Sequence, residues 1–263
     1  MRTQSLSQGN GVKVNGHSHA VEDEGPTRKT AIIGMACRLP GQVSTPEDLW
    51  KLCARRRSAW SEMPRSRFNQ KAFNHPNAQR SGAFNNQGGH FLDDDVSRFD
   101  APFFNITLQE AISLDPQQRI LLECTFEALE NAGISKQSLA GRNVGVFAGG
   151  SYADYEVRNV RDLDTIPMHQ ATGGAMTMHA NRISYYFDFH GPSFTVDTAC
   201  SSSLTALHLA CQSLRNGECS MAVVACAHLN LTPDLFVSMS LSRYVNLFLY
   251  FYTMFRTVLR IRD

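Results

Sequence analysis

One cysteine, Cys200, stands where a strand is expected to turn into a helix. The three residues of segment 194–196 are aromatic or β-branched, which predicts a short buried strand. Beyond the cysteine, apolar residues recur every three or four positions, as on one side of a helix: Leu204, Leu207, Cys211 and Leu214. Asn216-Gly217 predicts the end of that helix. The pattern therefore places Cys200 at the start of a helix.

A cysteine at a helix start is suited to nucleophilic catalysis. An ordinary thiol, with a pKa of about 8.5, is only a few per cent thiolate at neutral pH, and a helix N-terminus stabilises the charged form. The free N–H groups of the first helical turn can also hold the negative oxygen of a tetrahedral thioester intermediate. Ala199 and the serines at 201–203 are small and leave space around the thiol. We predict that Cys200 is a nucleophile and that backbone N–H groups beside it bind the oxyanion.

A buried structural cysteine is the alternative for any single thiol. The small-residue turn favours the catalytic interpretation here. A serine hydrolase would show G-x-S-x-G at such a turn, and a papain-like protease would show C-G-S-C-W near its mature N-terminus. Neither motif is present in the sequence.

The elements that must position this turn are predicted from apolar runs and helix caps. Segments 31–35, 144–150 and 221–227 are apolar on both faces and predict buried strands. Thr45 and Asp115 each precede a proline, which predicts two capped helices. Strands that alternate with helices over two hundred residues predict a layered α/β architecture. Aromatic residues between positions 60 and 100 are predicted to hold long loops against the body: Phe68, Phe73, Phe84, Phe91 and Phe99.

Composition excludes several functional classes. A net charge of +1 over 263 residues argues against a nucleic-acid-binding protein. The seven cysteines are an odd number, and the start of the chain lacks a signal-peptide pattern, which predicts reduced thiols and a cytoplasmic location. Neither C-x-x-C nor H-E-x-x-H occurs, so we expect no metal site.

The two ends of the chain differ from its middle. Residues 1–29 are polar and predict a disordered leader. Residues 244–263 form an aromatic and aliphatic run, which Asn246 and Arg256 interrupt, and which is shorter than the ~20 apolar residues of a membrane-spanning helix. We interpret this run as an apolar tail without a place in the fold. The alternative is an interfacial helix, which would associate the chain with a membrane.

Several motifs together resemble one enzyme family. Gly191-Pro192-Ser193, followed by Val-Asp-Thr-Ala-Cys-Ser-Ser-Ser-Leu at 196–204, resembles the active-site segment of β-ketoacyl synthases. Further segments agree in the same order along the chain: 31–41, 99–104, 115–119, 130–133 and 180–185. Together they resemble a fungal reducing polyketide synthase over residues 30–243, which we predict to be the β-ketoacyl synthase N-terminal domain. The resemblance implies the N-terminal half of a thiolase-like αβαβα fold and a homodimer.

The resemblance also implies a reaction. Cys200 would accept an acyl chain from the phosphopantetheine arm of an acyl carrier protein, and decarboxylative Claisen condensation with a malonyl thioester would follow. No cofactor bound directly by the chain is implied. In the family, two histidines and a lysine that drive decarboxylation come from positions beyond residue 263. The alternative is therefore a truncated, non-catalytic fragment or a dimerising partner.

Two residues depart from the family pattern. Cys226 and His228 stand where glycine and asparagine are expected, in the strand that follows the cysteine helix. Neither His228 nor His190 has a role in the family. His208 is expected ~12 Å from Cys200, since eight helical residues rise by ~1.5 Å each. We therefore assign no histidine to Cys200 from the sequence.

Overall fold

The structure is a computed structural model that describes residues 29–77, 79–241 and 254–261, the last of these as backbone only. The predicted leader, 1–29, lies almost wholly outside the described residues. The strands are β1 (Thr30–Arg38), β2 (Ser61–Glu62), β3 (Gly88–Gly89), β4 (Val144–Gly149), β5 (Ser193–Val196), β6 (Met221–Cys226) and β7 (Met254–Ile261). The α-helices are α1 (Pro46–Ala54), α2 (Gln70–Phe73), α3 (Leu108–Ser113), α4 (Pro116–Asn131), α5 (Lys136–Leu139), α6 (Asp154–Asn159), α7 (Gln170–Gly173), α8 (Met178–Phe187), α9 (Ser202–Arg215) and α10 (Asp234–Leu241). Two 3-10 helices, η1 (Leu163–Thr165) and η2 (Ala199–Ser201), join them.

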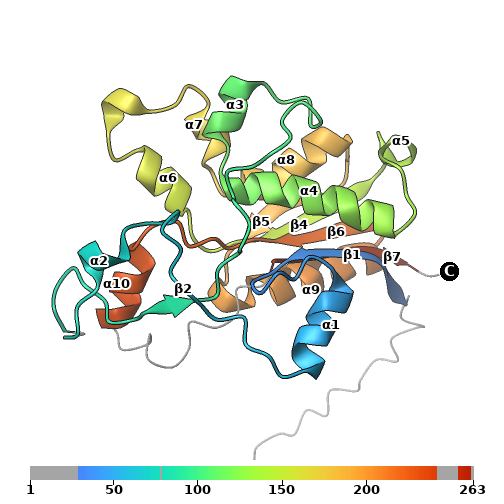
Figure 1. The fold of residues 1–263 in the computed structure, drawn as a ribbon. Helices are drawn as coiled ribbons and strands as arrows, with labels where there is room; N and C mark the ends of the chain where they lie inside the picture. The colour runs from blue at the N-terminus through green and yellow to red at the C-terminus, as the bar shows by residue number, and fades with distance from the viewer. Residues whose placement is uncertain (1–28, 78, 242–253, 262–263) are drawn as a thin grey trace, which may run out of the picture.

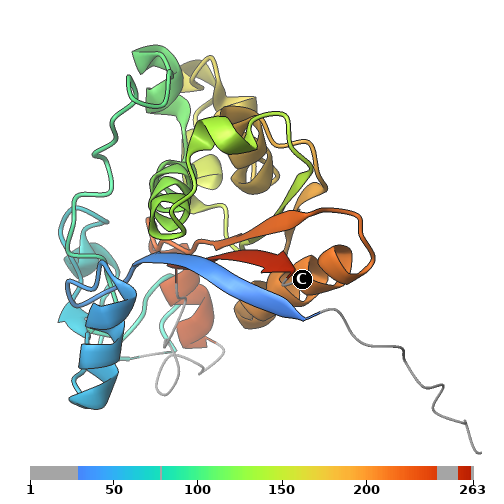
Figure 2. The ribbon, with the colours of Figure 1, turned by 90° about the vertical axis from the view of Figure 1, so that its right-hand side faces the viewer.

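A five-stranded sheet in the order β1-β7-β6-β4-β5 forms the middle layer. Strands β4, β5 and β6 are parallel, whereas β7 runs antiparallel to both of its neighbours. Helices α4 and α8 cover one face of the sheet, and α9 lies on the other face, with α1 beside β1 (Figures 1 and 2). The predicted layered α/β architecture is confirmed.

Strand β7 corrects the interpretation of the C-terminal run as a tail outside the fold. Its backbone pairs with β1 from Thr30↔Ile261 to Arg38↔Met254 and with β6 from Met221↔Arg260 to Ala225↔Arg256. Residues 254–261 therefore lie between two strands of the main sheet. The physical reason is that an extended backbone between two partner strands satisfies its N–H and C=O groups on both sides. The rest of the run, 244–253, lies outside the described residues.

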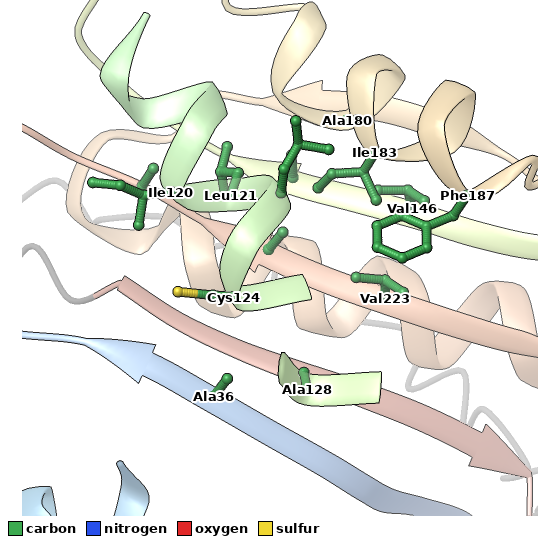
Figure 3. Close-up of a cluster of buried hydrophobic side chains, with 14 of the residues drawn as sticks. Ala36, Ile120, Leu121, Cys124, Ala128, Val146, Ala180, Ile183, Phe187 and Val223 are labelled. Carbon is green, nitrogen blue, oxygen red and sulfur yellow. The ribbon is translucent and has the colours of Figure 1, made fainter. Parts of the chain in front are cut away.

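The main core lies between α4, α8 and the sheet. Helix α4 begins as predicted, since the Asp115 carboxylate accepts a hydrogen bond from the Gln117 backbone N–H at 2.7 Å and Pro116 occupies the first helical position. The side chains that meet there come from α4, α8, β1, β4 and β6 (Figure 3): Ile120, Leu121, Cys124, Ala128, Ala180, Ile183, Phe187, Ala36, Val146 and Val223. This packing holds β4 and β6, whose carboxyl ends reach the site described below.

The predicted role of the aromatic residues at 60–100 is confirmed. In a second cluster, Phe68, Phe84 and Phe91 contact the ring of Phe236 of α10, and Phe73 contacts Phe68. The Phe91 and Phe236 rings stack with centroids 6.1 Å apart. Through these contacts, the long connecting segment between α1 and α3 packs against α10.

The cap of α4 predicts an unusual pH dependence of stability. Asp115 is fully buried, and burial raises the pKa of its carboxyl to about 6, with the nearby Asp154 acting in the same direction. A carboxyl whose pKa is higher in the folded than in the unfolded state stabilises the fold below the unfolded value of about 4. That stabilisation is lost as the pH rises through about 6. We expect the Asp115 contribution to the free energy of unfolding to fall by about 3 kcal/mol between about pH 4 and pH 7.

Urea denaturation of the wild-type chain and of Asp115→Asn measures this contribution at each pH. The wild type should lose stability relative to the variant as the pH rises, because asparagine does not titrate but still accepts the Gln117 N–H bond. Asp162→Asn, at the exposed cap of η1, serves as the matched control. Parallel pH curves for wild type and Asp115→Asn would contradict the prediction.

Candidate active site

Cys200 lies in η2, between β5 and α9, at the strand-to-helix turn that the sequence predicts. The strand itself is less buried than predicted. Within the described residues β5 pairs with β4 on one side and forms the edge of the sheet. Phe194 is therefore 39% exposed, although its ring contacts that of Phe147 with centroids 5.1 Å apart.

The turn holds a strained backbone. Ala199 has φ of 54°, in the left-handed region that costs a non-glycine residue about 1–2 kcal/mol. Side-chain hydrogen bonds offset this cost. The Ser202 hydroxyl accepts from the Thr198 N–H at 2.9 Å and donates to the Ala199 carbonyl at 2.7 Å. The Ser201 hydroxyl donates to the Thr198 carbonyl at 2.8 Å. Both neighbours of Cys200, Ala199 and Ser201, are therefore held by side-chain hydrogen bonds.

The Cys200 side chain is exposed and borders a cavity of about 50 Å³. Three segments of the chain line this cavity: the end of β4 with the residues after it, η2 with the start of α9, and the end of β6 with the residues after it. They supply Gly149, Gly150, Ser151, Ala199, Cys200, Ser202, Ser203, Cys226, Ala227 and His228. Because α9 begins at Ser202, its first turn lies at the Cys200 end of the helix, although the Ser202 N–H itself donates to the Ala199 carbonyl. The arrangement can hold a small anion or a carbonyl oxygen beside the thiol.

The departure at Cys226 is accommodated by Gly149 on the neighbouring strand. A Cβ atom added to Gly149 would lie 2.9 Å from the Cys226 Sγ and 2.9 Å from the Ser202 carbonyl carbon. Residue 149 therefore has no room for a side chain. Its glycine lets β4, the Cys226 thiol and the start of α9 meet at the cavity.

The other cysteines occupy different environments. Cys53 is also exposed, Cys211 is half-buried, and the remaining four are buried: Cys37, Cys124, Cys219 and Cys226. Burial raises the pKa of the Cys37 thiol to about 11, and burial also raises the pKa of Cys219. Raised pKa values make these two buried thiols poor nucleophiles. Cys200 and Cys53 are the two exposed thiols of the chain.

The structure brings His228 to the cavity, although the sequence assigned it no role. His228 is 8% exposed, and its Nε2 lies 2.9 Å from the Asn230 Oδ1. His208 instead contacts Gln212 on α9, and His190 pairs with Asp188. The sequence signal for His228 was its position two residues after the buried strand β6. Strand β6 pairs with β4 in parallel, and parallel strands bring their carboxyl ends to one edge of the sheet.

Two further observations concern ions and membranes. Among the described residues, no group of three or more His, Cys, Asp and Glu is placed to hold a metal ion. In the same part of the chain, none of the helices combines the length and the apolar character needed to cross a membrane.

Comparison with known proteins places this geometry in a family. Residues 27–246 match the family model described as "Beta-ketoacyl synthase, N-terminal domain", which is most of the chain. The chain belongs to the β-ketoacyl synthase family. This finding confirms the resemblance stated from the sequence motifs. The matched range includes the turn at Cys200 and every residue that lines the cavity.

Relatives of this β-ketoacyl synthase chain include fungal polyketide synthases. It is 62% identical over 216 residues to the "Highly-reducing polyketide synthase 1" of Aureobasidium melanogenum, covering 82% of this chain and 10% of that protein. It is 50% identical over 224 residues to the "Squalestatin tetraketide synthase" of a Phoma species, covering 85% of this chain and 8% of that protein. The chain thus spans about a tenth of the length of these curated relatives.

Solved ketosynthase structures share the fold. An oxazolomycin ketosynthase domain from Streptomyces albus matches with a TM-score of 0.78 and 31% identity, covering 89% of this chain and 42% of that one. The ketosynthase from module 6 of the bacillaene synthase of Bacillus subtilis matches with a TM-score of 0.75 and 31% identity, covering 88% and 40%. The fold of this β-ketoacyl synthase chain is thiolase-like, as predicted.

Proposed function

We propose that this chain carries the acyl-accepting cysteine of a ketosynthase that builds polyketides by decarboxylative Claisen condensation. The observation that supports this most directly is the position of Cys200. Its exposed thiol borders a small cavity at the start of α9, within the segment that matches the family. This position places the thiol at the positive end of a helix dipole, close to candidate donors for an oxyanion.

In the proposed transfer, the Cys200 thiolate attacks the carbonyl carbon of an acyl thioester on the phosphopantetheine arm of an acyl carrier protein. The carbonyl oxygen becomes an oxyanion in the cavity, where N–H groups of the first turn of α9 beyond Ser202 stabilise it. The phosphopantetheine thiolate then leaves, and the acyl group remains on Cys200. The thioester carries its own activated acyl group, so this transfer needs no cofactor resident in the chain.

In the proposed condensation, a malonyl thioester loses carbon dioxide, and the resulting carbanion attacks the acyl carbon on Cys200. A new carbon–carbon bond forms and the Cys200 thiolate is released. The chain covers 42% of the solved ketosynthase domain from Streptomyces albus. We assign acyl transfer to the described residues, and we infer that the groups that promote decarboxylation are supplied outside them. We also propose a cytoplasmic location, where thiols stay reduced.

Strand β5 supports a second role, as a homodimerising partner. Within the described residues its outer edge has no strand beside it. The strand itself carries an exposed apolar side chain, Phe194, at 39%. An open edge with an exposed apolar side chain favours association with a second copy of the chain. This role is compatible with acyl transfer and does not replace it.

The test follows both steps of the reaction. Purified chain is incubated with an acyl thioester and with malonyl carrier protein labelled in the free carboxyl group, and Cys200→Ala is run as the control. We expect an acyl mass on the Cys200 peptide of the wild type and none on the variant. Labelled carbon dioxide that depends on Cys200 would assign the whole condensation to this chain. Absence of acyl-Cys200 under conditions where the chain is folded would contradict the proposed function.

A further inference from the structure

One buried glutamine, Gln117 in the first turn of α4, contacts two of the segments that line the small cavity. Its side chain is 1% exposed. The Nε2 atom donates to the Tyr152 carbonyl at 3.2 Å, and the Oε1 atom accepts from the Leu229 N–H at 3.2 Å. These partners lie one residue beyond two residues that line the cavity, Ser151 and His228 respectively. Gln117 therefore bridges the segment after β4 and the segment after β6.

The bonds around Gln117 fix the orientation of its amide. A backbone carbonyl only accepts hydrogen bonds and a backbone N–H only donates, so the amide nitrogen faces Tyr152 and the oxygen faces Leu229. The second Nε2 hydrogen goes to Asp115 Oδ2 at 3.1 Å, and the Gln117 backbone N–H donates to Asp115 Oδ1 at 2.7 Å. Both amide hydrogens and the amide oxygen thus have partners, and the bridge has one arrangement.

The same two segments have further contacts. The rings of Tyr152 and His228 meet edge to face, with centroids 5.5 Å apart. On the segment after β6, Asp154 Oδ2 accepts from the Leu231 and Thr232 N–H groups at 3.0 and 3.1 Å. Asp154 belongs to α6. The segment after β6 is therefore held to both α4 and α6, beginning directly after a residue that lines the cavity.

The width of this cavity matters because the cavity is small. Its volume is about 50 Å³, against roughly 300–1,000 Å³ for an ordinary ligand pocket. It suits a single small group such as the carbonyl oxygen of a thioester. Donors stabilise an oxyanion from about 2.7–3.1 Å, and a misplacement of about 1 Å can cost about a hundredfold in rate. A residue that sets the spacing of the cavity walls therefore affects acyl transfer without contacting the substrate.

We propose that Gln117 is a positioning residue for acyl transfer, which sets the width of the cavity by joining the segments after β4 and β6. It acts through the backbone of Tyr152 and Leu229, and no proton moves to or from it. This inference rests on the proposed role of Cys200 as acyl acceptor. Because the bridge acts on the cavity and not on the thiol, its loss should slow acyl transfer and leave the alkylation of Cys200 unchanged.

Single-turnover acyl loading tests the proposal. Wild type and Gln117→Met are each mixed with excess acyl thioester, and the acyl mass on the Cys200 peptide is followed over time. Methionine keeps an unbranched side chain and makes none of the three amide hydrogen bonds. We expect the maximal rate constant to fall about tenfold or more, with the half-saturating thioester concentration changed by less than about twofold. A chain that merely folded less well would show a smaller loaded fraction at the wild-type rate constant.

Gln118→Met is the matched control. Gln118 is also 1% exposed and lies in the same turn, but its Nε2 donates to the Gly173 carbonyl at 2.8 Å, and Gly173 does not line the cavity. This variant should load within about threefold of wild type, a change of less than about 1 kcal/mol in the barrier. Iodoacetamide should label Cys200 within about twofold of the wild-type rate in all three chains, because alkylation forms no oxyanion.

Two results would overturn the proposal and leave the proposed function standing. Wild-type loading by a folded Gln117→Met chain would show that the bridge does not set the cavity. An equal fall in acyl loading and in alkylation would show that the substitution disturbs the whole turn at Cys200. A wild-type chain that is folded and does not load would instead refute the proposed function, and this inference with it.

Amide hydrogen exchange on the unsubstituted chain covers the case in which Gln117→Met does not fold. The Leu229 amide should exchange at least about a hundredfold more slowly than an unprotected amide, because its N–H is bonded to the Gln117 side chain. Acylation of Cys200 should slow this exchange by about threefold or more, since an occupied cavity and a closed bridge favour each other reciprocally. An unprotected Leu229 amide, or equal exchange before and after acylation, would overturn the proposal.

Discussion

Limiting iodoacetamide is expected to label Cys200 at least about tenfold faster than Cys53, although both thiols are exposed. The two cysteines lie at opposite helix ends. Cys53 lies in the last turn of α1, at the negative end of that helix dipole, whereas Cys200 lies in η2, directly before Ser201, the N-cap at the positive end of α9. Because both thiols are exposed, we take their positions at the helix ends as the main difference between Cys200 and Cys53. The exposed arginines at 55–57 act in favour of Cys53, but solvent and salt screen them.

Mass mapping after partial alkylation measures the ratio, and Cys53→Ser provides a control in which the Cys200 rate should not change. The buried thiols should react only after the chain unfolds, because burial keeps Cys37 and Cys219 protonated and out of reach. Labelling of Cys53 with Cys200 untouched would refute the assignment of Cys200 as the activated thiol of the turn.

Interrupting β7 is expected to remove most of the stability of the chain. Thr257 pairs with Met35 of β1 and with Val224 of β6, so its backbone lies between two strands. Thr257→Pro removes an N–H donor and places a ring between partner strands, which a central strand does not tolerate. We expect the free energy of unfolding to fall by at least about 3 kcal/mol, which is a large part of the about 5–15 kcal/mol typical of a native domain.

Thr257→Val is the matched control, because valine is β-branched and keeps the backbone N–H. Urea denaturation should give nearly the wild-type midpoint for valine and a much lower one for proline. Deletion of 254–263 should lower the midpoint as well and increase sedimentation, since it leaves β1 and β6 with open edges. A deleted chain that is as stable as the full chain and more soluble would restore the interpretation of this segment as a tail.

Features with a local cause could be predicted from the sequence. Thr45 and Asp115 cap α1 and α4 as expected, because a cap depends on the side chain and the next three residues. The turn at Cys200 was likewise predicted from nearby residues, all between positions 194 and 217. In the same way, the fully apolar run at 144–149 forms the buried strand β4.

Features that depend on distant residues could not be predicted in this way. The partial exposure of β5 follows from its place at the edge of the sheet, which its own residues do not encode. The strand at 254–261 depends on pairing with β1, which lies at the other end of the chain, so its own residues did not predict it. His228 lies at the Cys200 cavity because β6 pairs with β4. The order of strands in the sheet sets that pairing, and the local sequence does not reveal it.

The strand order also has a consequence for how the chain is made. In the sheet, β7 separates β1 from β6, yet roughly two hundred residues lie between the end of β1 and the start of β7. At about 5–20 residues per second, a ribosome needs about 10 to 40 s to synthesise that interval. During this time β1 has emerged without its neighbour in the sheet. The nascent chain therefore exposes an apolar strand for tens of seconds, and we expect its yield in cells to depend on chaperones that bind such strands.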